Sequence, residues 1–330
     1  MILFVYTGFS SIVKKDYDML HKYFRIKKIC YKASKKLIIN LLSQIEMFIW
    51  LLKNIWSAKF IYIWFADYHS LLPILFGKLF RKKSFLVLGG YDVTYIPEIK
   101  YGSFSNPLRA FCTKFSIKNA TLNLPVSDNL KEEVLEKIPN VKIKVLYTGH
   151  SKDQFFPLNS LKQRIVLTVG AGDTLLRIKL KGIDFFADVA RAMPEYKFIV
   201  IGICENALRY LKNIPFNLKI LGRVGQNELL KSYQKSKVYT QFSMREGLPS
   251  AVCEAMLCEC IPVGFNNGGI PIAIGDCGFI LKEKNVDKAV ELIKKAMNSN
   301  KSLGKKARQR IMNNFSIAKR EKKLFKLIVE

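Results

Sequence analysis

The chain alternates short apolar runs with longer amphipathic runs along its 330 residues, and the alternation starts again after residue 157. Apolar runs rich in Ile, Val, Leu and Phe are typical of strands that are buried on both faces of a parallel sheet. Amphipathic runs between such strands predict crossover helices, so the fold class is α/β. The restart, after a stretch with Gly149 and Pro157, predicts two such domains joined by a linker at 148–157.

The expected elements follow from these runs. In the first half we expect strands at 2–7, 60–64, 84–88, 122–126 and 145–147, and helices at 38–56 and 127–138. In the second half we expect strands at 165–170, 197–201, 219–221, 238–243 and 261–265, and helices at 182–193, 227–235 and 317–328. The domains are therefore placed at 1–150 and 151–313, and both are expected to be Rossmann-like and to face each other across a cleft.

Composition narrows the class of protein. The chain is 49% hydrophobic, which suffices for a sizeable core, but charged residues interrupt its most apolar region, 47–80. A transmembrane helix is therefore not expected. The segment 1–8 is expected to be a first core strand and not a signal peptide. Seven cysteines without framework spacing favour a reducing, cytoplasmic location.

The net charge of +28 is extreme for a chain of this length. The segment 21–36 has seven Lys and Arg and no acid, and 301–330 is similarly basic. Aromatic and aliphatic residues within the first segment indicate an interfacial surface, so we expect peripheral binding to an anionic membrane. Ordinary solvated faces in a lysine-rich protein are the alternative. A nucleic-acid partner is not expected, because no nucleic-acid motif accompanies the charge.

The strongest functional signal is the stretch Glu246-Gly-Leu-Pro-Ser-Ala-Val-Cys-Glu254. Gly247 and Pro249 predict a loop, and Ser250 is a good N-cap for a helix that reaches Glu254. The amides and the dipole at such a helix start bind anions. One acid before the helix and one within it would flank that anion. This arrangement suits a diphosphate between two polyhydroxyl groups, which is the shape of a nucleotide sugar.

This stretch, with Lys219–Val224 upstream and Ile261–Leu281 downstream, resembles the donor domain of glycosyltransferase family 4, whose fold is GT-B. The Glu-x7-Glu pair is the signature of that family. The resemblance implies that the last helix, about 314–330, returns to the first domain. It also implies a retaining, metal-independent transfer from a nucleotide sugar, with UDP or GDP as the nucleotide, to a glycan or lipid-linked acceptor.

The resemblance also implies roles for individual residues. Glu246 would contact the transferred sugar near the reacting centre, and Glu254 would accept hydrogen bonds from the ribose. Lys181, in Lys181-Gly-Ile-Asp184, matches the phosphate-binding lysine of the family, and Arg177 is the expected second cation, with Lys179 as the alternate. The rest of the donor site would comprise the loop near the base and the start of the helix, which are Gly222, Arg223, Val224, Gly247, Leu248, Pro249 and Ser250.

The acceptor side is less clearly defined. His69 and Asp92 follow the ends of expected strands, where they would face the cleft, although a turn or capping role is the alternative for both. Many family members have a histidine in the turn at 89–92, and this chain has glycine there. The details of acceptor-side catalysis are therefore left open.

Two other patterns suggest metal binding and are interpreted otherwise. Asp16-Tyr-Asp18 matches an Asp-x-Asp motif, but it follows two lysines at an expected helix start, where the helix dipole stabilises acidic side chains. Cys253, Cys258 and Cys260 lack a Cys-x-x-Cys spacing and a nearby histidine, so we expect Cys253 and Cys258 to be buried. No metal and no cofactor is expected.

Two rival functions stay open from the sequence. A nucleotide-sugar epimerase of the same fold would use the same donor site but would need no acceptor. An inactive basic module that binds lipid or nucleic acid would explain the charge, but it would leave the glutamate pair and the Lys-Gly-x-Asp motif without a purpose.

Overall fold

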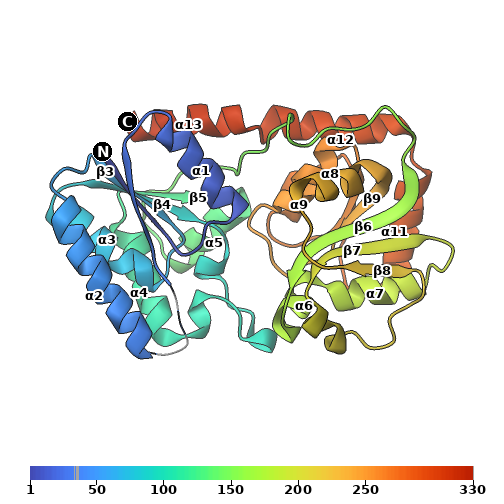
Figure 1. Cartoon of the computed structure of the whole chain (residues 1–330), viewed down its shortest axis with the longest axis horizontal. Helices are drawn as coiled ribbons and strands as arrows, with labels where there is room; N and C mark the ends of the chain where they lie inside the picture. The colour runs from blue at the N-terminus through green and yellow to red at the C-terminus, as the bar shows by residue number, and fades with distance from the viewer. Residues whose placement is uncertain (33, 35–36, 330) are drawn as a thin grey trace. The chain divides into compact units, whose positions relative to one another are not determined.

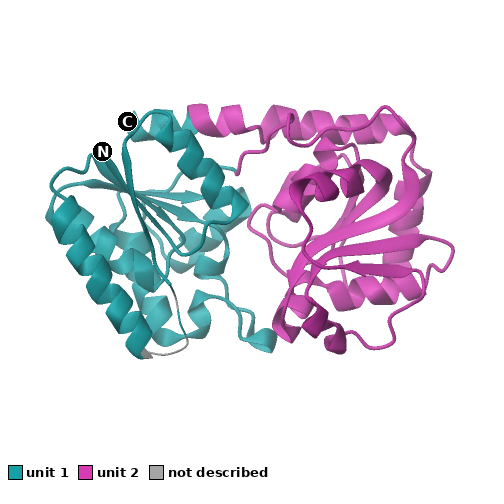
Figure 2. Ribbon diagram, viewed as in Figure 1, with its two compact units in different colours: residues 1–147, 323–330 teal, residues 148–322 magenta. Residues whose placement is uncertain are grey.

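The computed structural model describes residues 1–32, 34 and 37–329 (Figure 1). The chain divides into two compact units (Figure 2). Unit 1 comprises residues 1–147 and the segment from Lys323 onward, and unit 2 comprises Thr148–Lys322. Each unit is built on its own parallel sheet, as the alternation of strand and helix patterns predicts.

Unit 1 contains a five-stranded sheet of order β2-β1-β3-β4-β5, in which every pair is parallel. Its strands are β1 (Ile2–Tyr6), β2 (Ile26–Cys30), β3 (Phe60–Trp64), β4 (Lys83–Leu88) and β5 (Leu122–Pro125). The central strands β1 and β3 are buried along their whole length, which explains their unbroken apolar sequences. The edge strand β2 is largely exposed.

Helices cover this sheet. They are α1 (Ser11–His21), α2 (Leu37–Asn54), α3 (Tyr68–Leu79), α4 (Pro107–Asn119) and α5 (Asp128–Lys137), with short 3-10 turns at Tyr91–Val93, Pro97–Ile99 and Ser103–Ser105. The helix α3 lies between α2 and α4 and packs against both (Figure 1).

Unit 2 contains a six-stranded parallel sheet of order β11-β10-β9-β6-β7-β8. Its strands are β6 (Gln163–Gly172), β7 (Lys197–Ile203), β8 (Leu218–Leu221), β9 (Ser236–Gln241), β10 (Ile261–Phe265) and β11 (Phe279–Leu281). Strand order reverses between β6 and β9, where crossovers leave on either side. In sheets of this kind ligands bind at the carboxyl ends of the strands next to such a reversal.

In unit 2, α9 packs against α8, α10 and α12, and α7 packs against α6 and α11. The helical segments are α6 (Leu175–Lys181), α7 (Ile183–Arg191), the 3-10 turn Glu205–Tyr210, α8 (Gln226–Lys235), α9 (Ser250–Leu257), α10 (Ile270–Ile274), α11 (Val286–Asn298) and α12 (Lys301–Asn314). The last helix, α13 (Ile317–Val329), begins in unit 2, and its residues from Lys323 onward are grouped with unit 1.

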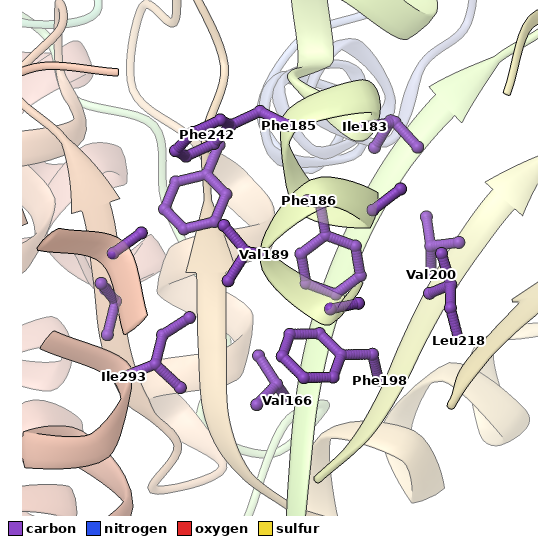
Figure 3. Close-up of a cluster of buried hydrophobic side chains, with 14 of the residues drawn as sticks. Val166, Ile183, Phe185, Phe186, Val189, Phe198, Val200, Leu218, Phe242 and Ile293 are labelled. Atoms are coloured by element: carbon purple, nitrogen blue, oxygen red, sulfur yellow. The ribbon is translucent and has the colours of Figure 1, made fainter. Parts of the chain in front are cut away.

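Aromatic side chains fill the core of unit 2 between the sheet and α7 (Figure 3). Phe185 contacts Phe242 with ring centroids 5.1 Å apart, and Phe186 contacts Phe198 at 5.3 Å. Burying such rings stabilises the fold by about 2–3 kcal/mol each. Because Phe242 directly follows β9 and Phe185 lies in the first turn of α7, this packing also fixes the two segments that carry the candidate site.

Three details differ from the sequence-based expectation. Residues 145–147 form no strand, because this segment runs beside the end of β5 through single bonds such as Leu146 N to Pro125 O, without a ladder. The strand β2 lies within the basic segment 21–36, where none was predicted. The expected loop around Arg177 is the helix α6, which Thr174 caps by accepting the amide of Arg177.

Candidate functional site

The loop after β9 and the start of α9 form the centre of the candidate site. The residue before the helix is Pro249, in an extended conformation, and Ser250 is the first helical residue instead of the N-cap that the sequence suggests. The fixed φ of proline suits a position directly before a helix. The hydroxyl of Ser250 is buried and finds no hydrogen-bond partner among the described residues. It lies beside the amides that α9 leaves unpaired at its start, so this end can donate to an anion.

A glycine turn supports this loop from below. The amide of Gly269 donates to the carbonyl of Glu246 at 3.0 Å. A Cβ on Gly269 would lie 1.8 Å from the carbonyl oxygen of Gly247, and one on Gly268 would lie 2.2 Å from that of Glu246. The two glycines are therefore required for the close approach of the backbones. This contact fixes the backbone of Glu246 and so the direction of its side chain.

Lys181 reaches the same point from α6. This helix ends at Gly182, whose φ of +65° is left-handed, and a Cβ there would lie 2.1 Å from the carbonyl oxygen of Phe242. The tight packing brings the Nζ of Lys181 to 2.6 Å from Glu246 Oε1. The amide of Gln241 donates to the same oxygen at 3.2 Å. Both charged side chains keep access to solvent, with 27% of Lys181 and 15% of Glu246 exposed.

Glu254 lies in the second turn of α9 and is 9% exposed. The hydroxyl of Tyr233 donates to its Oε2 at 3.3 Å. Burial raises the pKa of Tyr233 well above its ordinary value, so this phenol stays protonated and remains a donor. The contact orients the carboxylate within the wall of the site.

The structure pairs Arg177 with an acid that lies close to it in the sequence. Its Nε lies 3.3 Å from Asp173 Oδ1, and half of its side chain is exposed. Lys179 is exposed on the same helix. On α6, Arg177 lies one turn before Lys181 and on the same side, whereas Lys179 lies on another side, and both are open to solvent. The choice between them stays a prediction.

The loop expected near the base follows β8 at the carboxyl edge of the sheet. The carbonyl of Gly222 accepts the amide of Gly202 at 3.1 Å, which ties this loop to the end of β7. Gly222 and Arg223 are exposed and Val224 is half-buried. Leu248, in contrast, is 4% exposed, so it anchors the loop before α9 and has little surface for a ligand.

His69 and Asp92 hold loops together in unit 1. Asp92 is fully buried and accepts the amides of Ala66 at 2.5 Å, Gly89 at 2.7 Å and Gly90 at 2.9 Å. Burial raises the pKa of Asp92 to about 6, although these amides oppose the shift. His69 Nε2 pairs with the carbonyl of Trp64 at 2.8 Å, and burial lowers its pKa. These contacts fit the turn-holding alternative, and the acceptor role of both stays a prediction.

A more accessible polar cluster lies near the same strand ends of unit 1. The guanidinium of Arg109 contacts the carboxylate of Asp67 at 3.3 Å, and its Nη1 donates to the Tyr91 hydroxyl at 2.6 Å. It also lies over the ring of Tyr68 at 5.3 Å. Sequence reasoning missed Arg109 and Tyr91, because α3, α4 and a 3-10 turn supply the cluster from separate stretches. Gln241, at the end of β9, was missed for the same reason.

The other sequence patterns have structural explanations. Asp16 is buried and accepts from the Tyr62 hydroxyl at 2.7 Å and from Trp64 Nε1 at 2.9 Å, whereas Asp18 pairs with Lys14. The two carboxylates therefore do not share a ligand position. The buried state of Cys253 and Cys258 is confirmed.

Within the described part of the chain, no group of three or more His, Cys, Asp or Glu side chains could hold a metal ion. Across residues 1–32, 34 and 37–329, the helices are too short or too polar to span a bilayer.

Sequence comparison places unit 2 in a known family. Residues 151–314 match the model of the glycosyl transferases group 1. The trehalose synthase of Thermococcus litoralis is 30% identical over 155 residues, which cover 42% of this chain and 37% of that protein. An Escherichia coli UDP-Gal:alpha-D-GlcNAc-diphosphoundecaprenol alpha-1,3-galactosyltransferase is 25% identical over 44% of this chain and 41% of that protein. The match thus spans about two fifths of the length of these curated relatives.

Comparison with solved structures covers both units. The sucrose-phosphate synthase of Thermosynechococcus elongatus matches 99% of this chain and 98% of its own with a TM-score of 0.81 at 14% identity. Anabaena Alr3699/HepE in complex with UDP and glucose matches 100% and 99% with a TM-score of 0.78 at 12% identity. These structures establish the predicted GT-B fold. Residues 151–314, which lie in unit 2, therefore belong to the glycosyl transferases group 1, the family that the sequence resembles.

Proposed function

We propose that this protein is a retaining glycosyltransferase that moves a sugar from a nucleotide sugar to a glycan or lipid-linked acceptor at a membrane surface, without a metal ion. The observation that supports it most directly is the pair of Lys181 and Glu246 beside the start of α9. The cation and the helix start suit the negatively charged diphosphate of a nucleotide sugar, and the carboxylate suits the hydroxyls of its sugar.

In this proposal the leaving diphosphate is stabilised by fixed positive groups. The ammonium of Lys181 and the free amides at the start of α9 would bind its oxygens, and the unpartnered hydroxyl of Ser250 would donate to one of them. Arg177 would turn from Asp173 to add a second cation. Such groups can replace a divalent metal, because they supply positive charge where negative charge develops.

The two glutamates would have different tasks. Glu246 is partly exposed at the pair with Lys181, so it can accept hydrogen bonds from hydroxyls of the transferred sugar. Glu254, held by Tyr233, would accept from the ribose. When phosphate takes over Lys181, the carboxylate of Glu246 is released toward the sugar. Retention of anomeric configuration and the choice of UDP or GDP are proposed from the family resemblance alone.

The acceptor is proposed from two further observations. The name of the Escherichia coli relative describes transfer to a sugar on diphosphoundecaprenol, which is a lipid-linked acceptor. The net charge of +28 would attract an enzyme of this kind to an anionic bilayer, where such an acceptor resides. A peripheral position at the cytoplasmic face is therefore part of the proposal.

A thermal-shift screen against UDP, GDP, ADP and their sugar conjugates tests the donor site. A ligand that binds the native state raises the unfolding temperature. One nucleotide should give a shift that persists in EDTA and is lost in Glu254→Ala. A shift that EDTA abolishes would contradict metal independence, and no shift with any nucleotide would favour the inactive binding module.

Product analysis then separates transfer from epimerisation. With the donor identified by the screen, the epimerase alternative predicts an altered sugar nucleotide or free sugar without any acceptor. Our proposal predicts that the donor sugar keeps its identity and appears, with retained configuration, on lipid-linked glycan extracted from membranes.

A further inference from the structure

The helix α2 carries apolar side chains on the side that faces away from its unit. Its inner side is buried in unit 1 through Met47, Leu51 and the following Ile55, which are all fully covered. The outer side has eight large apolar residues that are between 42% and 71% exposed. We call this set the apolar face of α2: Ile38, Leu41, Leu42, Ile45, Phe48, Ile49, Leu52 and Trp56.

The spacing of these residues forms a continuous stripe. Ile38, Leu42, Ile45, Ile49 and Leu52 are alternately four and three residues apart, so they share one side of the helix. An ordinary surface helix is apolar toward the core and polar toward water. This helix is apolar on both sides, and the described residues of unit 1 leave its outer side uncovered. An exposed patch of this extent indicates a binding surface.

Basic residues lie at one end of the stripe. Lys78, Arg81, Lys82, Lys83 and Lys118 line a hollow of about 410 Å³ between the ends of α3 and α4 and the start of β4, and its other lining residues are uncharged. This basic hollow is joined to the stripe at Trp56. The Nζ of Lys82 donates to the Trp56 carbonyl at 3.2 Å, and the Trp56 ring contacts that of Phe80 at 4.7 Å.

Further basic residues precede α2 in the sequence. The segment 21–36 has seven Lys and Arg and no acid. Lys27, in β2, contacts the last residue of α2, near Trp56, where its Nζ donates to Asn54 Oδ1 at 2.6 Å. Glu46 is the one acid in the sequence of α2, and at 100° per residue it lies off the stripe.

We infer that the apolar face of α2 docks onto an anionic lipid bilayer, with its apolar residues in the acyl boundary and the basic hollow on the headgroups. An in-plane helix with an apolar side, a basic end and a tryptophan at its edge is what such an interface binds. The inference deepens the proposed function, on which it rests only for the presence of a membrane. It assigns the docking surface to α2, in addition to the basic segments of the sequence.

Charge argues against a second copy of the chain as the occupant. Two α2 helices paired in parallel would bring their basic hollows together. In antiparallel pairing, α2 offers the hollow of the other copy no acid except Glu46, which lies off the stripe. Like charges at such a rim cost free energy and slow association. An anionic bilayer, in contrast, neutralises the basic hollow and Lys27 at once.

Vesicle flotation of the full chain tests the inference. The wild type should bind vesicles with about one third phosphatidylglycerol and not pure phosphatidylcholine, and binding should weaken with salt. The double variant Ile45→Ser/Ile49→Ser should lose binding about tenfold or more. Leu161→Ser/Phe216→Ser, at apolar residues of unit 2 that are 93% and 89% exposed, should bind as the wild type does.

A charge pair of variants separates the two basic regions. Arg81→Glu/Lys83→Glu should reduce binding severalfold, whereas Lys301→Glu/Lys305→Glu on α12 should reduce it less. Undiminished flotation of the Ile45/Ile49 variant would overturn the inference. A wild type that is dimeric by light scattering and floats with no vesicle, while the Ile45/Ile49 variant is monomeric, would overturn it in favour of a second copy.

The donor site provides the internal control. Each variant should keep the wild-type thermal shift with the nucleotide chosen by the screen, because α2 carries none of the donor residues. Loss of flotation with a retained shift then supports the docking surface. A wild type that floats with the vesicles but shows no thermal shift with any nucleotide would still support the docking surface and would contradict the proposed transferase.

Discussion

The carboxyl ends of the two parallel sheets use polar side chains in opposite ways. In unit 2 the charged pair Lys181 and Glu246 remains partly exposed, beside a helix start with an unpartnered hydroxyl. In unit 1 the corresponding polar residues His69 and Asp92 are buried and bound to backbone groups. The same fold thus supplies an open polar site in one unit and a closed, loop-holding network in the other.

The contrast shows why position at a strand end is weak evidence for catalysis. Burial decides whether a carboxylate at such a position can reach a ligand. The carboxylate of Asp92 accepts hydrogen bonds from three backbone amides, whereas Glu246 accepts from side chains that a ligand can replace. In unit 1 the accessible polar group is Arg109 with Asp67 and Tyr91, and that cluster is a better candidate for contact with an acceptor.

The largest effect is expected for Glu246→Gln. The amide keeps the shape but removes the charge that orients the sugar, so transfer should fall by about 100-fold or more. Binding of the nucleoside diphosphate should persist or tighten, because Lys181 is freed for phosphate. Parallel measurements of turnover and of diphosphate affinity check this. Equal losses in both would mean that Glu246 merely supports the fold of the loop.

Asp92→Asn should sharpen the contrast through pH. A carboxyl whose pKa rises from 3.8 to about 6 on folding binds more protons in the native state, so its contribution to stability falls as pH rises from about 4 to 6. The size is on the order of 3 kcal/mol. The destabilisation caused by the variant should therefore be larger at pH 4 than at pH 7. Urea unfolding at several pH values measures it, and a difference that does not vary with pH would contradict the burial of an ionisable Asp92.

Gly182→Ala tests how the site of unit 2 is positioned. The added Cβ would lie 2.1 Å from the carbonyl oxygen of Phe242 at a left-handed φ. Relief of this clash must move α6 away from the loop after β9, at a cost of about 2 kcal/mol. Diphosphate affinity should fall along with stability. Gly225→Ala, where a Cβ meets no neighbour, is the matched control. If Gly182→Ala binds the diphosphate with wild-type affinity, the position of Lys181 set by Gly182 is not needed for binding.

The smallest effect is expected for Arg177→Ala. This side chain is half exposed and paired with Asp173, so its loss should raise the Michaelis constant for the donor severalfold, which is about 1 kcal/mol. Lys179→Ala, an exposed neighbour on the same helix, should have no effect. Steady-state kinetics with varied donor distinguish them, and the reverse result would make Lys179 the second phosphate-binding cation.

Most of the fold could be predicted because the buried strands have unbroken apolar sequences. The expected strands at 60–64 and 261–265 match β3 and β10 in both ends. Prediction failed where the pattern is weak. The strand β2 reads Ile-Lys-Lys-Ile-Cys and is an exposed edge, so its charges suggested a basic surface instead. The helix α6 is short, and its basic residues gave no clear period.

The donor site could be predicted further than the acceptor side for a similar reason. Glu246, Gly247 and Ser250 lie within one short stretch, so the sequence itself shows that they are close together. Lys181 lies 65 residues from Glu246 in the chain, so its place in the site was predicted only through the family resemblance, and its pairing with Glu246 was not predicted. The cluster of Arg109, Asp67 and Tyr91 arises from tertiary packing of separate elements, for which the sequence gives no spacing rule.

Titration calorimetry with the nucleoside diphosphate selected by the screen, in EDTA, tests the central claim most directly. The wild type and Glu246→Gln should both bind, whereas Lys181→Ala should lose roughly 10- to 100-fold in affinity, as expected for a charge-assisted contact to phosphate. Wild-type affinity in a folded Lys181→Ala variant would contradict the claim that the Lys181–Glu246 pair marks the nucleotide-sugar site.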